Sequence, residues 1–225
     1  MRIRRKKWAK EELENSKFYL DKPEINKGNW KNTFENLGPL HIELGCGKGL
    51  FISELASKTP DVNYIAVDMI EAMLGLAKRN IEENYLEKGL CTKEDLKPKN
   101  LWLIRANVEQ ISNVFSAQDE VERIYINFCN PWPKSKHNKR RLTHPRQLKQ
   151  YKEFLIPKGE IYFKTDDDEL FRSSLDYFEE EGFEIVDKTL DLQNEDIFRG
   201  NIETEHEKMF KEQGINIKAL IVKRI

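Results

Sequence analysis

Short apolar runs alternate with amphipathic stretches along most of the chain. Seven of these runs predict strands, at residues 40–44, 63–67, 101–106, 123–129, 159–165, 183–191 and 217–224. The stretches between them predict helices over 50–57, 70–84, 108–115, 145–155, 168–182 and 204–213. This alternation is typical of an α/β fold with helices on both faces of a mostly parallel sheet. The chain finishes without a full crossover, which predicts a seven-stranded sheet whose last strand is antiparallel.

The first 38 residues differ from the rest and predict a basic N-terminal arm. They begin Met-Arg-Ile-Arg-Arg-Lys-Lys, carry one short predicted helix near 9–18, and then become polar, with Gly28 and Gly38. The basic start has no apolar region behind it, so we do not expect a secretory signal. We therefore divide the chain into an arm, 1–38, whose composition allows it to be flexible, and a domain, 39–225.

Composition narrows the class of protein without naming a function. The net charge is −1 although 34% of the residues are charged, so overall charge does not point to nucleic acid. The three cysteines and four histidines lack the spacings of a zinc site or a disulfide framework, and we expect no metal. No apolar run approaches the roughly 20 residues of a membrane span, and we expect a cytoplasmic protein.

A glycine-rich loop follows the first predicted strand. Residues 43–49 read E-x-G-x-G-x-G, and Leu50 stands where a dinucleotide-binding loop would have its third glycine. S-adenosylmethionine has no pyrophosphate but carries a sulfonium and an ammonium, which Glu43 can attract, while Gly45 lets the backbone approach the ligand. Asp68 ends the second strand at a spacing suited to ribose hydroxyls. The alternative is a purely structural glycine turn.

Two asparagines end the third and fourth predicted strands. Asn107 can accept a hydrogen bond from an adenine amino group, although a helix cap explains it equally well. Asn130 precedes a proline and is therefore held extended. Prolines stiffen the backbone on both sides of Trp132, which could stack on a base. The alternative there is a tight turn with a half-buried tryptophan.

A basic run follows at once, from Lys134 to Arg141, and no acidic residue occurs from 130 through 152. Phosphate is the natural partner of such uncompensated charge, and a solvated basic face is the alternative.

Two later segments carry acids at predicted helix starts. Asp166 stands three residues before Glu169, and Thr204 stands three residues before Glu207. From the residues alone, helix capping of the capping-box type is the preferred interpretation of both.

Taken together, these segments resemble a known family, the bacterial tRNA (guanine-N7)-methyltransferases of the TrmB type. That family carries E-x-G-x-G, D-P-W-x-K, H-N-K-R-R, F-K-T-D and G-N-x-x-T-E-x-E in this order. The corresponding segments here lie at 43–47, 130–134, 137–141, 163–166 and 200–207. The resemblance covers residues 40–225, and the five segments together are highly specific although each alone is weak.

The resemblance implies a class I methyltransferase (Rossmann-like) fold and methyl transfer from S-adenosylmethionine to N7 of a guanine in the tRNA variable loop. It implies a catalytic role for Asn130 and cofactor contacts from Glu43, Gly45, Asp68, Asn107 and Asn130. It implies substrate contacts from Lys134, Asp166, Thr204, Glu205, His206 and Glu207. It implies RNA contacts from Lys136, His137, Asn138, Lys139, Arg140 and Arg141. The partner would be tRNA, with no membrane, and the protein a monomer or homodimer.

Two positions depart from the family pattern. The family usually has Asp where this chain has Asn130, and often Asp where it has Asn107. Guanine N7 has a lone pair and no proton, so methyl transfer needs in-line placement rather than a general base. A carboxylate would also stabilise the positive charge that arrives on the purine, and an amide offers only a dipole. We therefore expect activity, lower than that of an Asn130→Asp variant.

Two alternatives stay open at this point. Asn130-Pro131-Trp132 partly matches the motif of enzymes that methylate exocyclic amines, in which the aromatic residue follows two prolines. A catalytically weak tRNA-binding protein with the same fold is the other.

Overall fold

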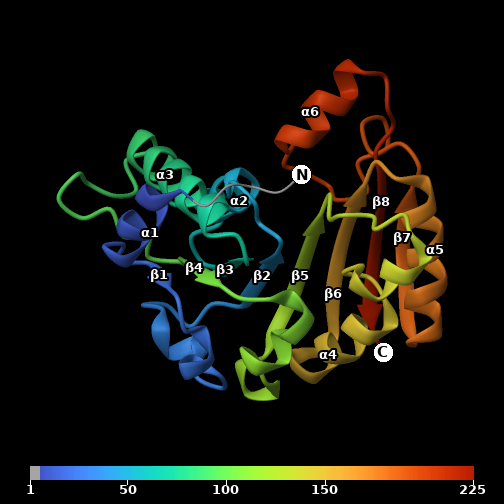
Figure 1. Cartoon of the computed structure of the whole chain (residues 1–225), viewed down its shortest axis with the longest axis horizontal. Helices are drawn as coiled ribbons and strands as arrows, with labels where there is room; N and C mark the ends of the chain where they lie inside the picture. The colour runs from blue at the N-terminus through green and yellow to red at the C-terminus, as the bar shows by residue number, and fades with distance from the viewer. Residues whose placement is uncertain (1–5) are drawn as a thin grey trace.

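A single sheet organises the chain, and within residues 6–225, which this computed structural model describes, it has eight strands in the order β1-β4-β3-β2-β5-β6-β8-β7 (Figure 1). They are β1 Tyr19–Leu20, β2 Leu40–Leu44, β3 Asn63–Asp68, β4 Leu101–Arg105, β5 Val121–Asn127, β6 Leu155–Thr165, β7 Phe183–Thr189 and β8 Lys218–Arg224. Pairing is parallel from β1 to β6, whereas β8 runs antiparallel to β6 and β7. The predicted fold class and antiparallel last strand are confirmed.

The predicted strand count of seven is wrong because β1 has only two residues. It extends the sheet beyond β4, with Tyr19 beside Leu103 and Leu20 beside Ile104. Two residues carry no detectable alternation of apolar and polar positions, so the sequence pattern does not predict such a strand. The short helix expected near 9–18 ends earlier, at Glu14, which leaves the chain free to form β1.

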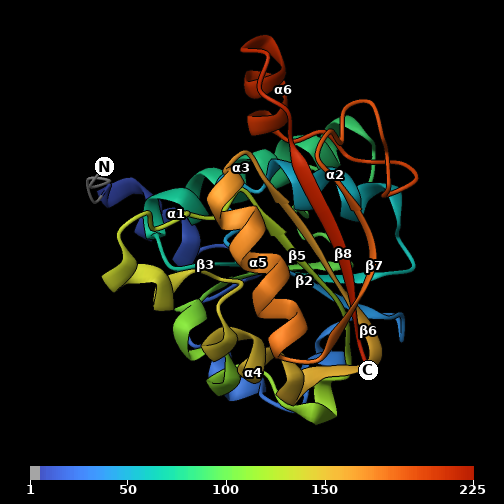
Figure 2. The same ribbon diagram turned by 90° about the vertical axis from the view of Figure 1, so that its right-hand side faces the viewer.

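Helices cover both faces of the sheet (Figures 1 and 2). The α-helices are α1 Lys7–Glu14, α2 Leu50–Lys58, α3 Glu71–Glu87, α4 Pro145–Phe154, α5 Asp168–Glu180 and α6 Glu205–Glu212. Short 3₁₀ helices are η1 Pro23–Asn26, η2 Trp30–Thr33, η3 Val108–Asn113, η4 Ala117–Asp119 and η5 Ser135–Arg140. Apolar side chains of α1, α2 and α3 form the core on one face, and those of α4 and α5 form it on the other. Helix α6 instead lies beyond the ends of β5 and β6.

Residues 6–38 of the predicted arm pack against both faces. In α3, a Cβ added to Gly75 would lie 2.7 Å from the Cβ of Ala9, so only glycine lets α1 approach this closely. On the opposite face Trp30 is fully buried, and its indole donates to the carbonyl of Val114 at 3.0 Å. Asp119 accepts from the amide of Trp30 at 3.0 Å. The first five residues of the basic start lie outside the described residues, and the division of the chain at residue 38 stays a prediction.

We predict that Trp30→Ala lowers the free energy of unfolding by about 3–5 kcal/mol, the usual cost of truncating a buried tryptophan. Leu37→Ala is the control, because Leu37 is 92% exposed in the same stretch and should change stability by less than about 0.5 kcal/mol. Urea-induced unfolding followed by fluorescence and circular dichroism measures both. Equal stability of the two variants would show that this stretch is not part of the cooperative unit.

Candidate active site

A cavity of about 630 Å³ lies at the carboxyl ends of β2 and β5, between the glycine loop and α6. Its walls are formed by Glu43, Gly45, Cys46, Gly47, Lys48, Gly49, Leu50, Phe51, Met73, Asn127, Phe128, Thr204, Glu205, His206 and Met209. Ligands of open α/β sheets bind at this edge, where neighbouring strands lead to connections on opposite sides. The cavity is therefore the candidate active site.

The glycine loop forms one wall of the cavity and leads into α2. Gly45, Gly47 and Gly49 have φ angles of 81°, 54° and 69°, which favour glycine. A Cβ at Gly49 would also lie 2.8 Å from the Cβ of Ala77 in α3, so a larger residue would push the loop out of place. No side chain among the described residues caps the start of α2. Its free backbone amides can therefore attract an anionic group such as a carboxylate.

Glu43 lines the cavity and is buried. One oxygen, Oε1, accepts from the Asn127 amide at 2.9 Å, and Oε2 has no hydrogen-bond partner among the described residues. Burial raises the pKa of Glu43 to about 7, against the opposing effects of the Asn127 hydrogen bond and the Lys164 charge. A buried carboxylate with an unpaired oxygen is costly, and a positively charged ligand group would relieve that cost. The residues present thus fit a ligand with an ammonium.

Asp68 is the last residue of β3, and Asn107 follows the end of β4. Neither residue lines the cavity. Asp68 accepts from the amides of Gly47 at 3.0 Å and Ile70 at 2.8 Å, so it braces the glycine loop, and burial raises its pKa. Asn107 is exposed, and its side chain accepts from the amide of Glu109 at 3.0 Å. This is the helix cap that the sequence left open. Ribose and adenine contacts by these two residues stay predictions.

The segment after β5 is strained and carries Asn130 at its exposed turn. Phe128 and Trp132 have φ angles of 50° and 45°, which residues with a side chain rarely adopt. The Asn130 Oδ1 accepts from the amide of Trp132 at 3.0 Å, which closes a local turn. The Asn130 side-chain amide nitrogen has no partner among residues 6–225 and stays available to a ligand. Strain of this kind is often found at functional sites.

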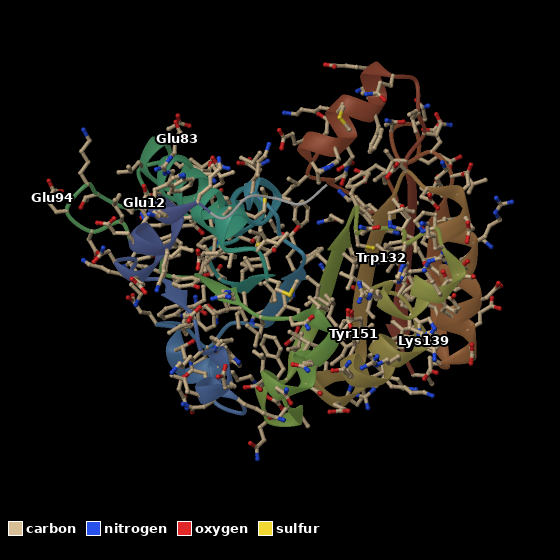
Figure 3. All side chains as sticks on the ribbon, in the orientation of Figure 1. Glu12, Glu83, Glu94, Trp132, Lys139 and Tyr151 are labelled. Carbon is tan, nitrogen blue, oxygen red and sulfur yellow. The ribbon has the colours of Figure 1, made fainter. Side chains whose placement is uncertain are left out.

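The basic run forms η5 and surrounds Trp132. The Arg140 guanidinium lies 5.1 Å from the centre of the Trp132 ring, and the His137 ring lies 5.7 Å from it. In the view of Figure 3, Trp132, Lys139 and Tyr151 all lie over the half of the molecule that carries β5, β6 and β8. Lys134, Lys136, Lys139 and Arg140 are exposed. An aromatic ring with a cation over it, among exposed lysines, is suited to a nucleobase and its phosphates.

Arg141 differs from the rest of the run because its side chain is only 1% exposed. It donates to the Pro131 carbonyl at 2.7 Å, to the Ser173 hydroxyl at 3.1 Å and to the Glu169 carboxylate at 2.8 Å. All three contacts are internal, so the side chain has no surface to offer to RNA. We therefore withdraw Arg141 from the predicted RNA contacts, since it fastens the loop to α5.

The two predicted capping boxes have different outcomes. At α6 the prediction is confirmed: Thr204 accepts from the Glu207 amide at 3.1 Å, and Glu207 accepts from the Thr204 amide at 2.8 Å. At α5 it is wrong by one residue, because Asp167 accepts from the amide of Leu170. The Asp166 carboxylate is half-buried and has no partner among the described residues. It is thereby left available to a substrate.

The cavity brings together only some of the predicted residues. Glu43, Gly45, Thr204, Glu205 and His206 line it, whereas Asp68, Asn107, Asn130, Lys134, Asp166 and Glu207 do not. The basic residues 136–141 also lie outside its wall. His206 stacks on Phe128, with ring centres 5.4 Å apart and planes 16° apart. Glu205 forms an ion pair with Lys48 of the glycine loop at 2.8 Å.

The residues of this site that sequence reasoning missed include Asn127, Phe128 and Lys164. Asn127 and Phe128 lie on the cavity wall just before the strained turn. Lys164 is buried at the carboxyl end of β6, beside Asn127 in the sheet register. For Asn127 and Lys164 the sequence did offer a signal, because each is a polar residue at the end of an apolar run.

In the described part of the chain, no cluster of metal-binding side chains and no helix able to span a membrane is found.

The strand order, the glycine loop and the acidic residue that ends β2 define a class I methyltransferase. Solved structures agree on the fold. The 16S rRNA methyltransferase KamB has a TM-score of 0.60 at 13% identity, over 86% of this chain and 90% of its own. TrmN from Thermus thermophilus has a TM-score of 0.56 at 20% identity, over 84% of this chain and 44% of its own.

Sequence comparison shows the family. Residues 37–220 match a family model described as "Putative methyltransferase". The tRNA (guanine-N(7)-)-methyltransferase of Clostridium beijerinckii is 57% identical over 98% of both chains. The enzyme of the same name from Clostridium perfringens strain SM101 is 53% identical over the whole of both chains. This chain belongs to the bacterial tRNA (guanine-N7)-methyltransferase family.

Proposed function

We propose that this protein transfers a methyl group from S-adenosylmethionine to N7 of a guanine in the variable loop of tRNA. The observation that carries the proposal is the unpaired, buried oxygen of Glu43, which lines the same cavity as the glycine loop. This oxygen supports a cationic cofactor. The identity of the acceptor as tRNA is supported by the names of the relatives that match nearly the full chain. Since the acceptor is tRNA, we place the protein in the cytoplasm.

The cofactor would be held by its two charged ends and by its nucleoside. Glu43 would accept from the ammonium, and the free amides at the start of α2 would receive the carboxylate. Gly45 would let the backbone come close, Asp68 would bind ribose hydroxyls and Asn107 the adenine. When bound, S-adenosylmethionine supplies an electrophilic methyl group on its sulfonium.

The acceptor guanine would be placed by groups around the mouth of the cavity. The side-chain amide of Asn130 can donate to O6 of the purine, which lies beside N7, and so fix the ring for in-line attack. The free carboxylate of Asp166 can accept from the N1 and N2 hydrogens of guanine, which adenine lacks. Lys134, with the cavity residues Thr204, Glu205 and His206, would contact the nucleotide. Exposed residues of 136–140 would bind the phosphates.

The proposal predicts that unmodified tRNA transcript incubated with labelled S-adenosylmethionine acquires 7-methylguanosine. Nucleoside digestion and mass spectrometry identify the product. Glu43→Gln is the matched control, because it keeps the shape of the side chain but removes the charge that would hold the ammonium. N6-methyladenosine in place of 7-methylguanosine would favour an exocyclic-amine methyltransferase, and no transfer at all would contradict the proposal.

We predict that Asn130→Ala lowers kcat at least about tenfold, since it removes the group that places the guanine. Asn130→Asp should raise kcat, because a carboxylate stabilises the positive charge formed on the purine. Asp also retains the oxygen that accepts from the Trp132 amide, so the turn is preserved. It exchanges the amide donor to O6 for a carboxylate, and we expect the stabilisation of charge on the purine to outweigh the lost hydrogen bond. Single-turnover rates at saturating tRNA measure both variants. If Asn130→Ala transfers methyl as fast as wild type, Asn130 has no catalytic role.

We predict that replacing Lys136, Lys139 and Arg140 with Ala weakens tRNA binding and flattens its salt dependence. Each lost phosphate contact should reduce the slope of log K against log salt by roughly 0.7–0.9, so three should reduce it by about 2. Filter binding between low and moderate salt gives the slope. Lys99→Ala is the control, because Lys99 is 76% exposed and distant in sequence from the basic run. An unchanged slope in the triple variant would mean that the run is only a solvated face.

A further inference from the structure

A buried ion pair lies beside the cavity, between Lys164 of β6 and Glu207 of α6. The Lys164 Nζ lies 3.0 Å from the Glu207 Oε2, and the side chains are 2% and 3% exposed. The rings of Phe51 and Phe198 flank the ammonium, with their centres 5.2 and 5.3 Å away. Ionised groups are rarely buried to this extent unless every one of their hydrogen bonds is made.

All three donors of Lys164 are used on one segment of the chain. Besides Glu207, the ammonium donates to the Asn201 side chain at 2.6 Å and to the Ile202 carbonyl at 3.1 Å. The second Glu207 oxygen accepts from the Asn201 amide at 2.7 Å. Residues 201–207 are therefore fixed to the sheet through one lysine. The cavity residues Thr204, Glu205 and His206 belong to this segment.

Lys164 also acts on Glu43, which lines the cavity. It pairs with Asn127 in the register of β5 and β6, and Asn127 donates to Glu43. The charged groups that face Glu43 are Lys164, which favours its carboxylate form, and Asp68 of β3, which disfavours it. Around Lys164 itself lie Glu207 and Asp196, both of which favour the ammonium. The buried ammonium of Lys164 thus interacts both with residues 201–207 and with the carboxylate of Glu43.

We propose that Lys164 is a positioning residue of the cofactor site, with Glu207 as its structural partner. It holds residues 201–207, which include the cavity residues Thr204, Glu205 and His206, and its charge favours the carboxylate form of Glu43, which would receive a ligand ammonium. Glu207, whose two oxygens are both occupied by the protein, acts through this pair and not as a substrate ligand. The inference rests on the proposed function only in taking that ammonium to belong to S-adenosylmethionine or its product.

Stability alone does not explain why the chain retains this pair. Two well-packed apolar side chains often stabilise a core as well as a buried ion pair does, because burying charge costs several kcal/mol per ion. Removing a single partner would leave an uncompensated buried charge, so Lys164→Met alone is expected to be strongly destabilised. The double variant Lys164→Met/Glu207→Gln removes both charges and keeps similar side-chain volumes. It is therefore the variant that tests position and charge in a folded protein.

The test is calorimetric binding of S-adenosylhomocysteine, which keeps the ammonium and is stable in alkali, from pH 6 to pH 9. In the wild type, part of Glu43 is protonated below pH 7 and must lose its proton when the ammonium binds. Affinity should therefore rise with pH through about 7 and then level off. Without Lys164 the pKa of Glu43 rises further, so the pH at which the affinity levels off moves upward.

We expect the ratio of variant to wild-type Kd to exceed one at every pH, because the wall is displaced. It should be about tenfold larger at pH 6 than at pH 9, since a rise of one in the pKa of Glu43 corresponds to tenfold in affinity. The ratio cancels the titration of the ligand itself. Lys78→Met is the control, because it breaks a half-buried pair with Glu82 on α3, away from the cavity, and should give a ratio near one.

The outcomes separate the two proposals. A variant ratio that is the same at every pH, or a ratio of one throughout, would overturn the role of Lys164 while leaving the proposed function intact. Failure of the wild type to bind S-adenosylhomocysteine at any pH would overturn the proposed function, and this inference with it. Circular dichroism of the double variant confirms that a folded protein was compared.

Discussion

Charge buried at the carboxyl edge of the sheet is the constraint on which this site depends. Glu43, Lys164 and Glu207 are each nearly inaccessible to solvent, and each must be compensated by a neighbour. Lys164 satisfies one Glu207 oxygen directly and favours the charged form of Glu43. A single acceptor, Oε2 of Glu43, is left unpaired in this set, and it lies in the cavity wall. Within this set of three charges, the pairing is therefore complete except at the one oxygen that a cationic ligand can reach.

The strand order explains why this edge holds the site. β2 lies between β3 and β5, so the chain leaves it toward one side of the sheet and returns later on the other. The loops after β2 and β5 diverge at that point, and the space between them is the cavity. Helix α6 lies beyond the strand ends (Figure 2), and its residues Glu205, His206 and Met209 line the cavity. Residues at the ends of β2 and β5 line the cavity together with residues from late in the chain, 204–206 and 209.

Sequence patterns predicted the features that depend on residues near one another in the chain. They missed the features that depend on which residues of adjacent strands lie side by side. The seven longer strands were predictable because each presents at least five residues of apolar pattern, whereas β1 presents two. The roles of Asn127 and Lys164 follow from lying side by side in adjacent strands, and no spacing in the sequence encodes that neighbour relation. The cap of α5 falls at Asp167 and not Asp166, since three successive aspartates offer equivalent candidates and tertiary packing selects among them.

Arg141 shows why the basic run could not be interpreted residue by residue. The preceding residues Lys139 and Arg140 are exposed, yet the Arg141 guanidinium is buried against α5 and donates to the carbonyl of Pro131. That carbonyl belongs to the strained turn, whose other fixed points are the Phe128 amide on the Lys164 carbonyl and the Trp132 amide on Asn130. Left-handed backbone at Phe128 and Trp132 is unfavourable by itself and persists only where such contacts hold it. Arg141, the buried arginine of this run, thus helps to hold the turn that presents Asn130, while Lys139 and Arg140 beside it stay exposed.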